Sequence, residues 1–165
     1  MNWEKTGSTQ YELRQGDHIL ANMKISGASA VCTIGSRLIH LQRRGFWQSA
    51  IEMTDHNGQV LLRTEPAKWW GSKSIFNWNS LPYELDIRNA PLAEYFICQG
   101  GHEVLAYGLK AGSGKTTFAI SETDHLQEEG VLELHLLLWF LFHPIVEGET
   151  TNFISDEALV SVISA

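Results

Sequence analysis

Cysteine is scarce in this chain of 165 residues, which contains only Cys32 and Cys98. Neither belongs to a Cys-x-x-Cys pair or to a Cys/His spacing typical of zinc sites. Both lie in apolar, strand-like runs, so we expect two buried free thiols. Seven histidines are present, but none has the spacing of a motif such as His-Glu-x-x-His. We therefore expect no metal site and no cofactor.

Basic residues are also few, with 12 Lys and Arg against 19 Asp and Glu and a formal net charge of −7. This balance argues against a general nucleic-acid binder, and it weakens any broad attraction to anionic membranes while leaving local basic spots open. The first residues contain no apolar run that would indicate a signal peptide. We expect a cytoplasmic protein, with peripheral membrane association as a further possibility.

A phosphate-binding loop is missing, although the string GSGKTT occurs at residues 112–117. The G-x-x-x-x-G-K-[ST] motif requires a glycine where Leu109 stands, and it requires a helix after the lysine. Residues 115–121 instead alternate like a strand, so we expect a β-hairpin around 112–114 and no nucleotide site. No G-x-S-x-G nucleophile motif occurs either. The sequence therefore predicts a non-catalytic protein.

Short strand-like runs fill residues 9–121 and are separated by turn residues at intervals of about 8–12 residues. The clearest turn is Asn57-Gly58, a pair that tolerates the left-handed conformation of a tight hairpin. The pattern changes at 128–143, where we expect a central helix ending before Pro144, because the leucine-rich run at 131–143 contains no glycine or proline. A helix that is apolar on all sides needs apolar surroundings. Its 13 most apolar residues, 131–143, are too few to span a bilayer, so we expect no transmembrane span.

These elements predict a single domain over residues 1–165 of the mainly β class. We expect a closed antiparallel β-barrel of about 11–12 strands around a buried hydrophobic C-terminal α-helix. Residues 147–165 would form a tail or a short helix packed on the barrel or on a partner. A barrel filled by a helix has no room for an internal ligand, so ligands would bind at its rim or outside it.

The order of elements resembles the tubby C-terminal-like superfamily, in its LURP-one-related and scramblase-like branch. The resemblance covers about residues 9–146. It rests on YELRQGD at 11–17, IEMTDHNGQV at 51–60 and the helix at 131–142 followed by Pro144. It implies a β-barrel around a central helix and a lipid-binding, membrane-tethered or protein-interacting module. It implies no functional residues for this chain, because the phosphoinositide-contacting lysines and arginines of tubby proteins have no matching positions here.

Two basic and aromatic segments are the candidate binding sites. Lys68, Trp69, Trp70 and Lys73 suit a membrane interface, where indoles lie at headgroup depth and ammonium groups meet phosphates. The alternative is that the rings pack in the core or cover the barrel mouth. Arg43 and Arg44 precede Phe46-Trp47 and form either a second part of such a site or an ordinary solvated turn.

If both segments lie at one end of the barrel, they would form a lipid or acidic-peptide site. We therefore expect a non-catalytic binding module with peripheral phospholipid binding. The alternative is a protein-interaction or structural domain. The oligomeric state and the partner are not predicted.

Overall fold

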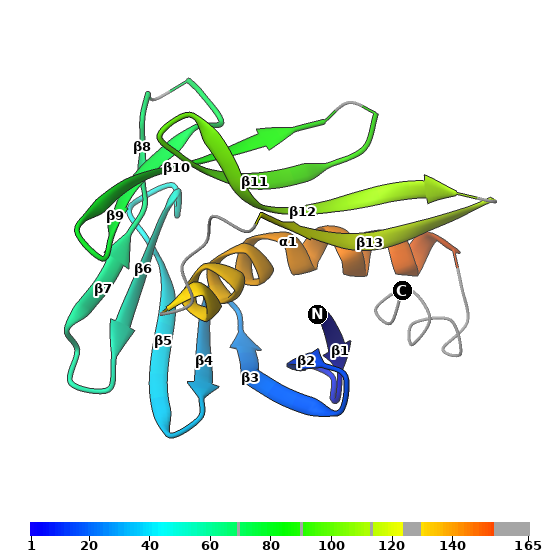
Figure 1. The fold of residues 1–165 in the computed structure, drawn as a ribbon, viewed down its shortest axis with the longest axis horizontal. Helices are drawn as coiled ribbons and strands as arrows, with labels where there is room; N and C mark the ends of the chain where they lie inside the picture. The colour runs from blue at the N-terminus through cyan, green and yellow to red at the C-terminus, as the bar shows by residue number, and fades with distance from the viewer. Residues whose placement is uncertain (69, 90, 113, 124–129, 154–165) are drawn as a thin grey trace.

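The chain folds into two antiparallel β-sheets that curve around one helix (Figure 1). The computed structural model describes residues 1–68, 70–89, 91–112, 114–123 and 130–153. The first sheet has seven strands in chain order: β1 (Asn2–Lys5), β2 (Gln10–Gln15), β3 (His18–Ser26), β4 (Ser29–Ile34), β5 (Arg37–Arg44), β6 (Ala50–Asp55) and β7 (Val60–Arg63). The second has six: β8 (Glu65–Pro66), β9 (Ser74–Trp78), β10 (Leu81–Arg88), β11 (Glu94–Gln99), β12 (His102–Gly112) and β13 (Lys115–Glu122).

The predicted hairpins are confirmed. Asn57-Gly58 connects β6 to β7, and Gly58 has a φ of +80°, which glycine adopts without steric cost. The GSGKTT segment connects β12 to β13, whose pairing continues to Gly112 and Lys115. Two short strands were not predicted: β1, which precedes residue 9, and β8, which has only two residues. Their brevity leaves too little alternation to recognise.

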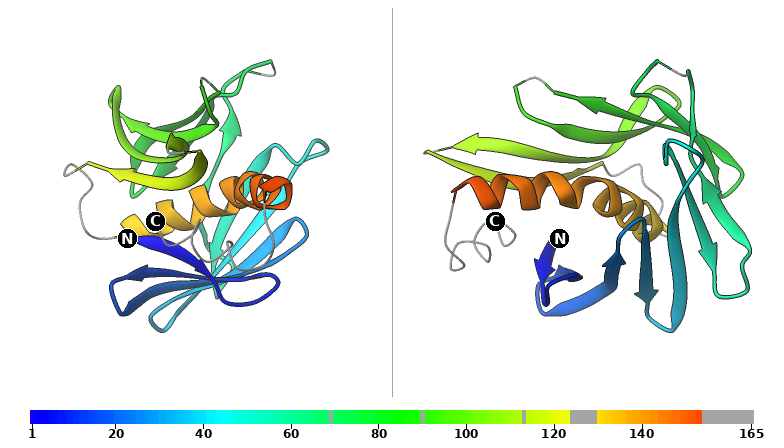
Figure 2. Two further views of the ribbon diagram at one scale, coloured as in Figure 1. Left: turned by 90° about the vertical axis from the view of Figure 1, so that its right-hand side faces the viewer. Right: turned by 180° about the vertical axis from the view of Figure 1, so that it is seen from behind.

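The prediction of a closed barrel is wrong, because neither sheet closes on itself. The chain crosses from one sheet to the other at Thr64, and beyond it β8 pairs with β9 through Glu65 and Pro66 alone. On the opposite side, β1 and β13 are the outer strands of their sheets, and no backbone ladder joins them in the described part of the chain. Figure 2 shows the helix lying between the two sheets along this side. Its bulky side chains fill the space that closure would require.

The helix α1 (Val131–Phe153) passes through Pro144, so the predicted end at residue 143 is wrong. A proline lacks the N–H that would bond to the carbonyl four residues earlier, here that of Phe140. The Nδ1 atom of His143 lies 3.1 Å from this carbonyl oxygen and 3.3 Å from that of Trp139. As a donor, the imidazole replaces the missing backbone group. The helix thereby extends into the segment that was predicted as a tail, of which residues 154–165 lie outside the described part.

The core forms where the inner faces of both sheets meet α1. Leu134, Leu137, Leu138, Trp139 and Phe142 are completely buried on different sides of the helix. The prediction of a helix surrounded by apolar contacts is therefore confirmed. At 23 residues and about 1.5 Å per residue the helix is about 35 Å long, and it runs beside β12, the longest strand (Figure 1).

Candidate functional site

The β5–β6 and β8–β9 connections lie at the same end of the first sheet, where the chain passes into the second sheet. The antiparallel order directs the end of β5 and the start of β6 towards this end, and β7 returns to it before continuing into β8. β8 lies beside β6. In Figure 1 the β8–β9 connection lies at the top of the molecule, and the β5–β6 connection lies below it on the same side. Both candidate segments of the sequence belong to these connections.

The β5–β6 connection exposes two adjacent aromatic rings. Gly45 and Gln48 have φ values of +85° and +51°, and the N–H of Gln48 donates to the carbonyl of Gly45 over 3.1 Å. This tight turn directs Phe46 and Trp47 into solvent, where 90% and 83% of their surfaces are exposed. The two rings meet edge to face, with centroids 4.8 Å apart. Because such rings each present about 150–250 Å² of mainly apolar surface, their joint exposure indicates a contact surface.

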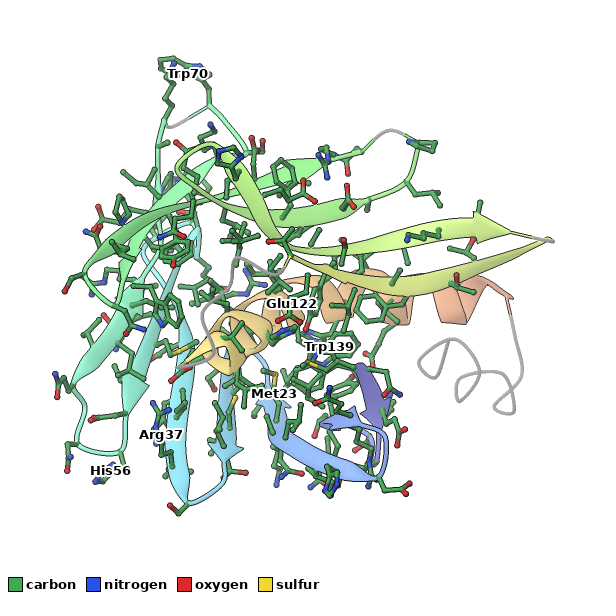
Figure 3. The ribbon with its side chains drawn as sticks, viewed as in Figure 1. Met23, Arg37, His56, Trp70, Glu122 and Trp139 are labelled. Carbon is green, nitrogen blue, oxygen red and sulfur yellow. The ribbon has the colours of Figure 1, made fainter. Side chains whose placement is uncertain are left out.

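The β8–β9 connection adds a third exposed ring. Trp70 is 68% exposed, and Figure 3 shows it at the tip of this connection, far from the core residue Trp139. The Nζ atom of Lys68 lies 5.9 Å from the centre of the Trp70 ring. Lys73 instead pairs with Glu84 over 2.9 Å, and this bond raises the pKa of the lysine. Trp69 lies outside the described residues.

Arg43 and Arg44 point to opposite faces of the sheet, as successive strand residues must. The guanidinium of Arg43 lies on the inner side, 5.3 Å from the centre of the Phe140 ring on α1. Arg44 lies on the outer side and pairs with Glu52, which Arg63 also contacts. Burial raises the pKa of Glu52, but the two arginines outweigh this effect and lower it. Of the two predicted arginines, only Arg44 therefore lies on the outer side of the sheet.

We name the exposed set formed by Phe46, Trp47, Lys68 and Trp70 the aromatic rim. Lys68 is the one cation of this set, and it has no ion pair among the described residues. Arg44 stands at the base of the same connection as Phe46. The aromatic rim thus combines large apolar surface with a small positive charge.

A second polar arrangement lies inside the protein and was not predicted. The indole Nε1–H of Trp3 donates to the hydroxyl of Tyr107 over 2.8 Å, and this hydroxyl lies 2.8 Å from Nδ1 of His135. The Nε2 atom of His135 lies 3.5 Å from a carboxylate oxygen of Glu122. Because the Tyr107 hydroxyl accepts a proton from Trp3, it donates its own proton to Nδ1 of His135, which acts as the acceptor. The neutral imidazole then carries its hydrogen on Nε2, which faces Glu122. This contact with His135 is the main reason that the pKa of Glu122 is lowered.

This buried chain resembles a proton relay in its order of groups but lacks access to a substrate. Trp3, Tyr107 and His135 are completely buried, and burial raises the pKa of Tyr107 well above its ordinary value. A general acid or base must lie within hydrogen-bond reach of the reacting group. Only Glu122 is partly exposed. The arrangement connects β1, β12, β13 and α1, and it stabilises the fold. A histidine inside an apolar run is the one sequence signal that pointed to it.

The remaining expectations concern histidine and cysteine. His135 and His143 are both hydrogen-bonded, while His125 lies outside the described residues. Within the described ranges, no group of three or more His, Cys, Asp or Glu side chains is placed to hold a metal ion. Both cysteines are free, with Cys32 buried and Cys98 only half-buried. Burial is the main reason that the pKa of each thiol is raised.

Comparison with known proteins yields no relative: no family model matches the chain, and neither a curated protein nor a solved structure is similar to it. One helical segment, Val131–Gly148, is long and apolar enough to cross a membrane by length and composition. However, 56% of it is buried in the fold, and the core helix of a soluble protein meets the same criteria. The assignment of function therefore depends on the exposed surfaces.

Proposed function

We propose that this protein is a non-catalytic binding module of the tubby and LURP-one-like type that binds phospholipid membranes peripherally through the aromatic rim. The observation that carries the proposal is the exposure of Phe46, Trp47 and Trp70 on two connections at one end of the molecule. Indole rings favour the boundary between headgroups and acyl chains, where one part of the ring is apolar and the other is wet.

The energetics favour a weak and reversible contact. Full burial of one aromatic side chain contributes about 1.5–3 kcal/mol, so three rings supply about 5–9 kcal/mol before the cost of association. Lys68 adds attraction to phosphate, although the overall charge of −7 opposes approach to a strongly anionic surface. We infer that binding depends mainly on the rings and is helped by moderate anionic content.

The non-catalytic part of the proposal rests on the position of the titratable groups. The relay of Tyr107, His135 and Glu122 lies in the core, and its buried members cannot contact a substrate. We infer that α1 is likewise a core element, because its apolar side chains contact both sheets. Membrane contact would then involve only the connections, with the helix remaining inside the fold.

Liposome flotation tests the proposal directly. Full-length protein is mixed with vesicles of phosphatidylcholine alone, with added phosphatidylserine, or with added phosphoinositide, at low and physiological salt. We expect Phe46→Ala/Trp47→Ala and Trp70→Ala to reduce the floated fraction at least about fivefold, because each removes apolar surface from the contact. Lys68→Ala should reduce flotation on the anionic vesicles alone.

Ile19→Ala is the matched control. Ile19 is 48% exposed and stands at the start of β3, which the antiparallel order places at the opposite end of the first sheet. It should float like the wild-type protein. Absence of flotation on every vesicle, or equal loss in the Ile19 variant, would exclude the aromatic rim as a membrane site and favour the protein-interaction alternative.

A further inference from the structure

Arg43 is the exception among the six arginines of the chain. The other five each pair with at least one carboxylate: Arg14, Arg37, Arg44, Arg63 and Arg88. Arg43 has no ion pair among the described residues, and its guanidinium lies against the Phe140 ring instead. Because charges that leave the solvent are normally paired, an arginine without a carboxylate on the inner side of a sheet indicates a place for an anion.

The strand register places Arg43 at the edge of the inner space. Ile39 and Leu41 are buried on the inner face of β5, and Arg43 continues this row. Its partner in the β5–β6 ladder, Ile51, is also buried. Arg43 itself is only partly buried, because β5 ends one residue later. Solvent and solutes can therefore reach the guanidinium.

The helix supplies no counter-ion at this position. At the start of β5, Arg37 pairs over 2.7 Å with Glu133 in the first turn of α1. Near the end of β5, Arg43 contacts Phe140, about two turns further along the helix. α1 and β5 therefore run in the same direction. Residues 134–146 of the helix include no Asp or Glu, so the helix neutralises Arg37 and leaves Arg43 unpaired.

Tyr95 on β11 supplies a second donor. Its ring meets Phe142 of α1 edge to face, with centroids 5.5 Å apart, so it lies on the inner face of the second sheet. Burial raises the pKa of Tyr95, and the positive charge of Arg43 partly opposes this rise, as expected for a guanidinium close to the phenol. The neutral phenol keeps its proton and can donate it. The two sheets thus each contribute one donor beside the C-terminal half of α1.

These groups suit an anion with several oxygens. The guanidinium is a flat fork that binds two oxygens of a phosphate or carboxylate at once, and the phenol adds a donor from another direction. A carboxylate has only two oxygens in one plane, whereas the oxygens of a phosphate point in several directions. Glu147, one turn after His143 on α1, is held by Lys5 and Tyr11, so its charge is already compensated.

We propose that Arg43 and Tyr95 form a binding site for a phosphate group, with two oxygens on the guanidinium and a third on the phenol. The phosphate belongs either to a soluble compound or to the headgroup of a phospholipid. Phe46 of the aromatic rim follows Arg43 by three residues, which brings a headgroup within reach during membrane contact. The site does not rest on the proposed membrane function, because free phosphate needs no lipid to bind.

An NMR titration of the labelled full-length protein tests the site in the absence of lipid. Sodium phosphate replaces sodium chloride at constant ionic strength and pH 7. We expect the side-chain signals of Arg43 and Tyr95 to shift and to saturate, with a Kd of about 1–10 mM. Sodium acetate should bind at least about fivefold more weakly, because it cannot offer a third oxygen to the phenol.

Variants of the protein separate the two donors. Arg43→Gln should weaken phosphate binding at least about tenfold, and Arg43→Lys about threefold, because lysine keeps the charge but lacks the fork. Tyr95→Phe keeps the ring on Phe142 and should weaken binding about threefold. Lys24→Gln is the matched control, since it makes the same change in net charge as Arg43→Gln at an exposed position on the outer face of β3. It should leave the titration unchanged.

Flotation on vesicles of phosphatidylcholine with phosphatidic acid distinguishes the two sources of phosphate. A loss of at least about threefold in Arg43→Gln, with Lys24→Gln like the wild-type protein, would assign the site to a lipid headgroup. Unchanged flotation of Arg43→Gln together with a saturable titration would assign it to a soluble compound. Absence of flotation in the wild-type protein with an intact titration would reject the proposed membrane function and leave the phosphate site in place.

The proposal is overturned if phosphate up to about 50 mM leaves both signals unchanged and Arg43→Gln floats like the wild-type protein. It is also overturned if acetate binds as tightly as phosphate, or if Lys24→Gln weakens binding as much as Arg43→Gln. Arg43 would then only cover the Phe140 ring. The wild-type titration reports on both side chains and keeps the test valid if a variant fails to fold.

Discussion

Trp3 and Tyr107 are 104 residues apart in the chain, and the Trp3 indole donates a hydrogen bond of 2.8 Å to the Tyr107 hydroxyl. This bond connects β1, at the edge of one sheet, to β12 in the other. The Trp3 ring also stacks on Trp139 of α1, with centroids 5.1 Å apart and planes 9° apart. Side chains therefore join the sheets on the side where backbone pairing is missing.

Loss of the Tyr107 hydroxyl should weaken this junction. Tyr107→Phe keeps the ring but leaves the Trp3 donor and the His135 acceptor without a partner in a buried site. We expect the free energy of unfolding to fall by about 1–3 kcal/mol. Urea denaturation followed by circular dichroism measures the change. Tyr83→Phe is the matched control, because the Tyr83 hydroxyl has no hydrogen bond within the described part of the chain, and a loss there of the same size would contradict the prediction.

Glu147 should make stability depend on acid pH. Burial opposes its ionisation, but hydrogen bonds from Lys5 and Tyr11 outweigh burial and lower its pKa below 4.5. As the pH falls, the unfolded chain therefore binds the proton first. The contribution is complete above about pH 4.5 and is lost as the pH falls through the folded pKa.

The Tm measured by calorimetry between pH 6 and 3 should consequently fall less steeply in Glu147→Gln than in the wild-type protein. Glu65→Gln, which changes a carboxylate without an ion pair among the described residues, should retain the wild-type profile. Parallel profiles for the wild-type protein and Glu147→Gln would show that Glu147 does not contribute.

His143 should matter to the helix only while Pro144 is present. Pro144→Ala restores a backbone donor to the Phe140 carbonyl, so we expect the stability to stay unchanged or to rise by up to about 3 kcal/mol. His143→Phe removes the imidazole donor and keeps an aromatic ring beside Tyr11 and Trp139. A double-mutant cycle on unfolding free energies should give a coupling of about 1 kcal/mol between the two positions. Additive effects would mean that His143 does not replace the missing donor.

Glu52 should restrain binding to anionic membranes, if the proposed function is correct. Glu52→Gln releases the guanidinium groups of Arg44 and Arg63 near the aromatic rim. We expect a larger floated fraction on phosphatidylserine vesicles at low salt, since each basic residue near such a surface contributes about 1 kcal/mol. Stability should fall by about 1 kcal/mol or less, because both arginines are half-exposed. Unchanged flotation together with lower stability would limit Glu52 to a structural role.

Much of the local structure could be predicted from the sequence. Alternation and turn residues are local signals, and for that reason the hairpins at Asn57-Gly58 and GSGKTT were predicted correctly. The sequence also predicted that the helix is buried, because its side chains are apolar on all sides, and the structure confirms this. The two candidate segments were recognised by composition. However, composition did not show that Arg43 faces the core or that Phe46 and Trp47 are the most exposed rings.

The sequence by itself therefore determined the class of this protein: antiparallel strands joined by turns and one helix that must be buried. Only the tertiary structure decided that the sheets remain open and that α1 continues past Pro144. Each of these depends on contacts between distant residues, such as Trp3 with Tyr107, or on the replacement of a backbone donor by a side chain. Local patterns in a sequence do not encode which distant side chains meet, because packing selects among arrangements that the same strands allow.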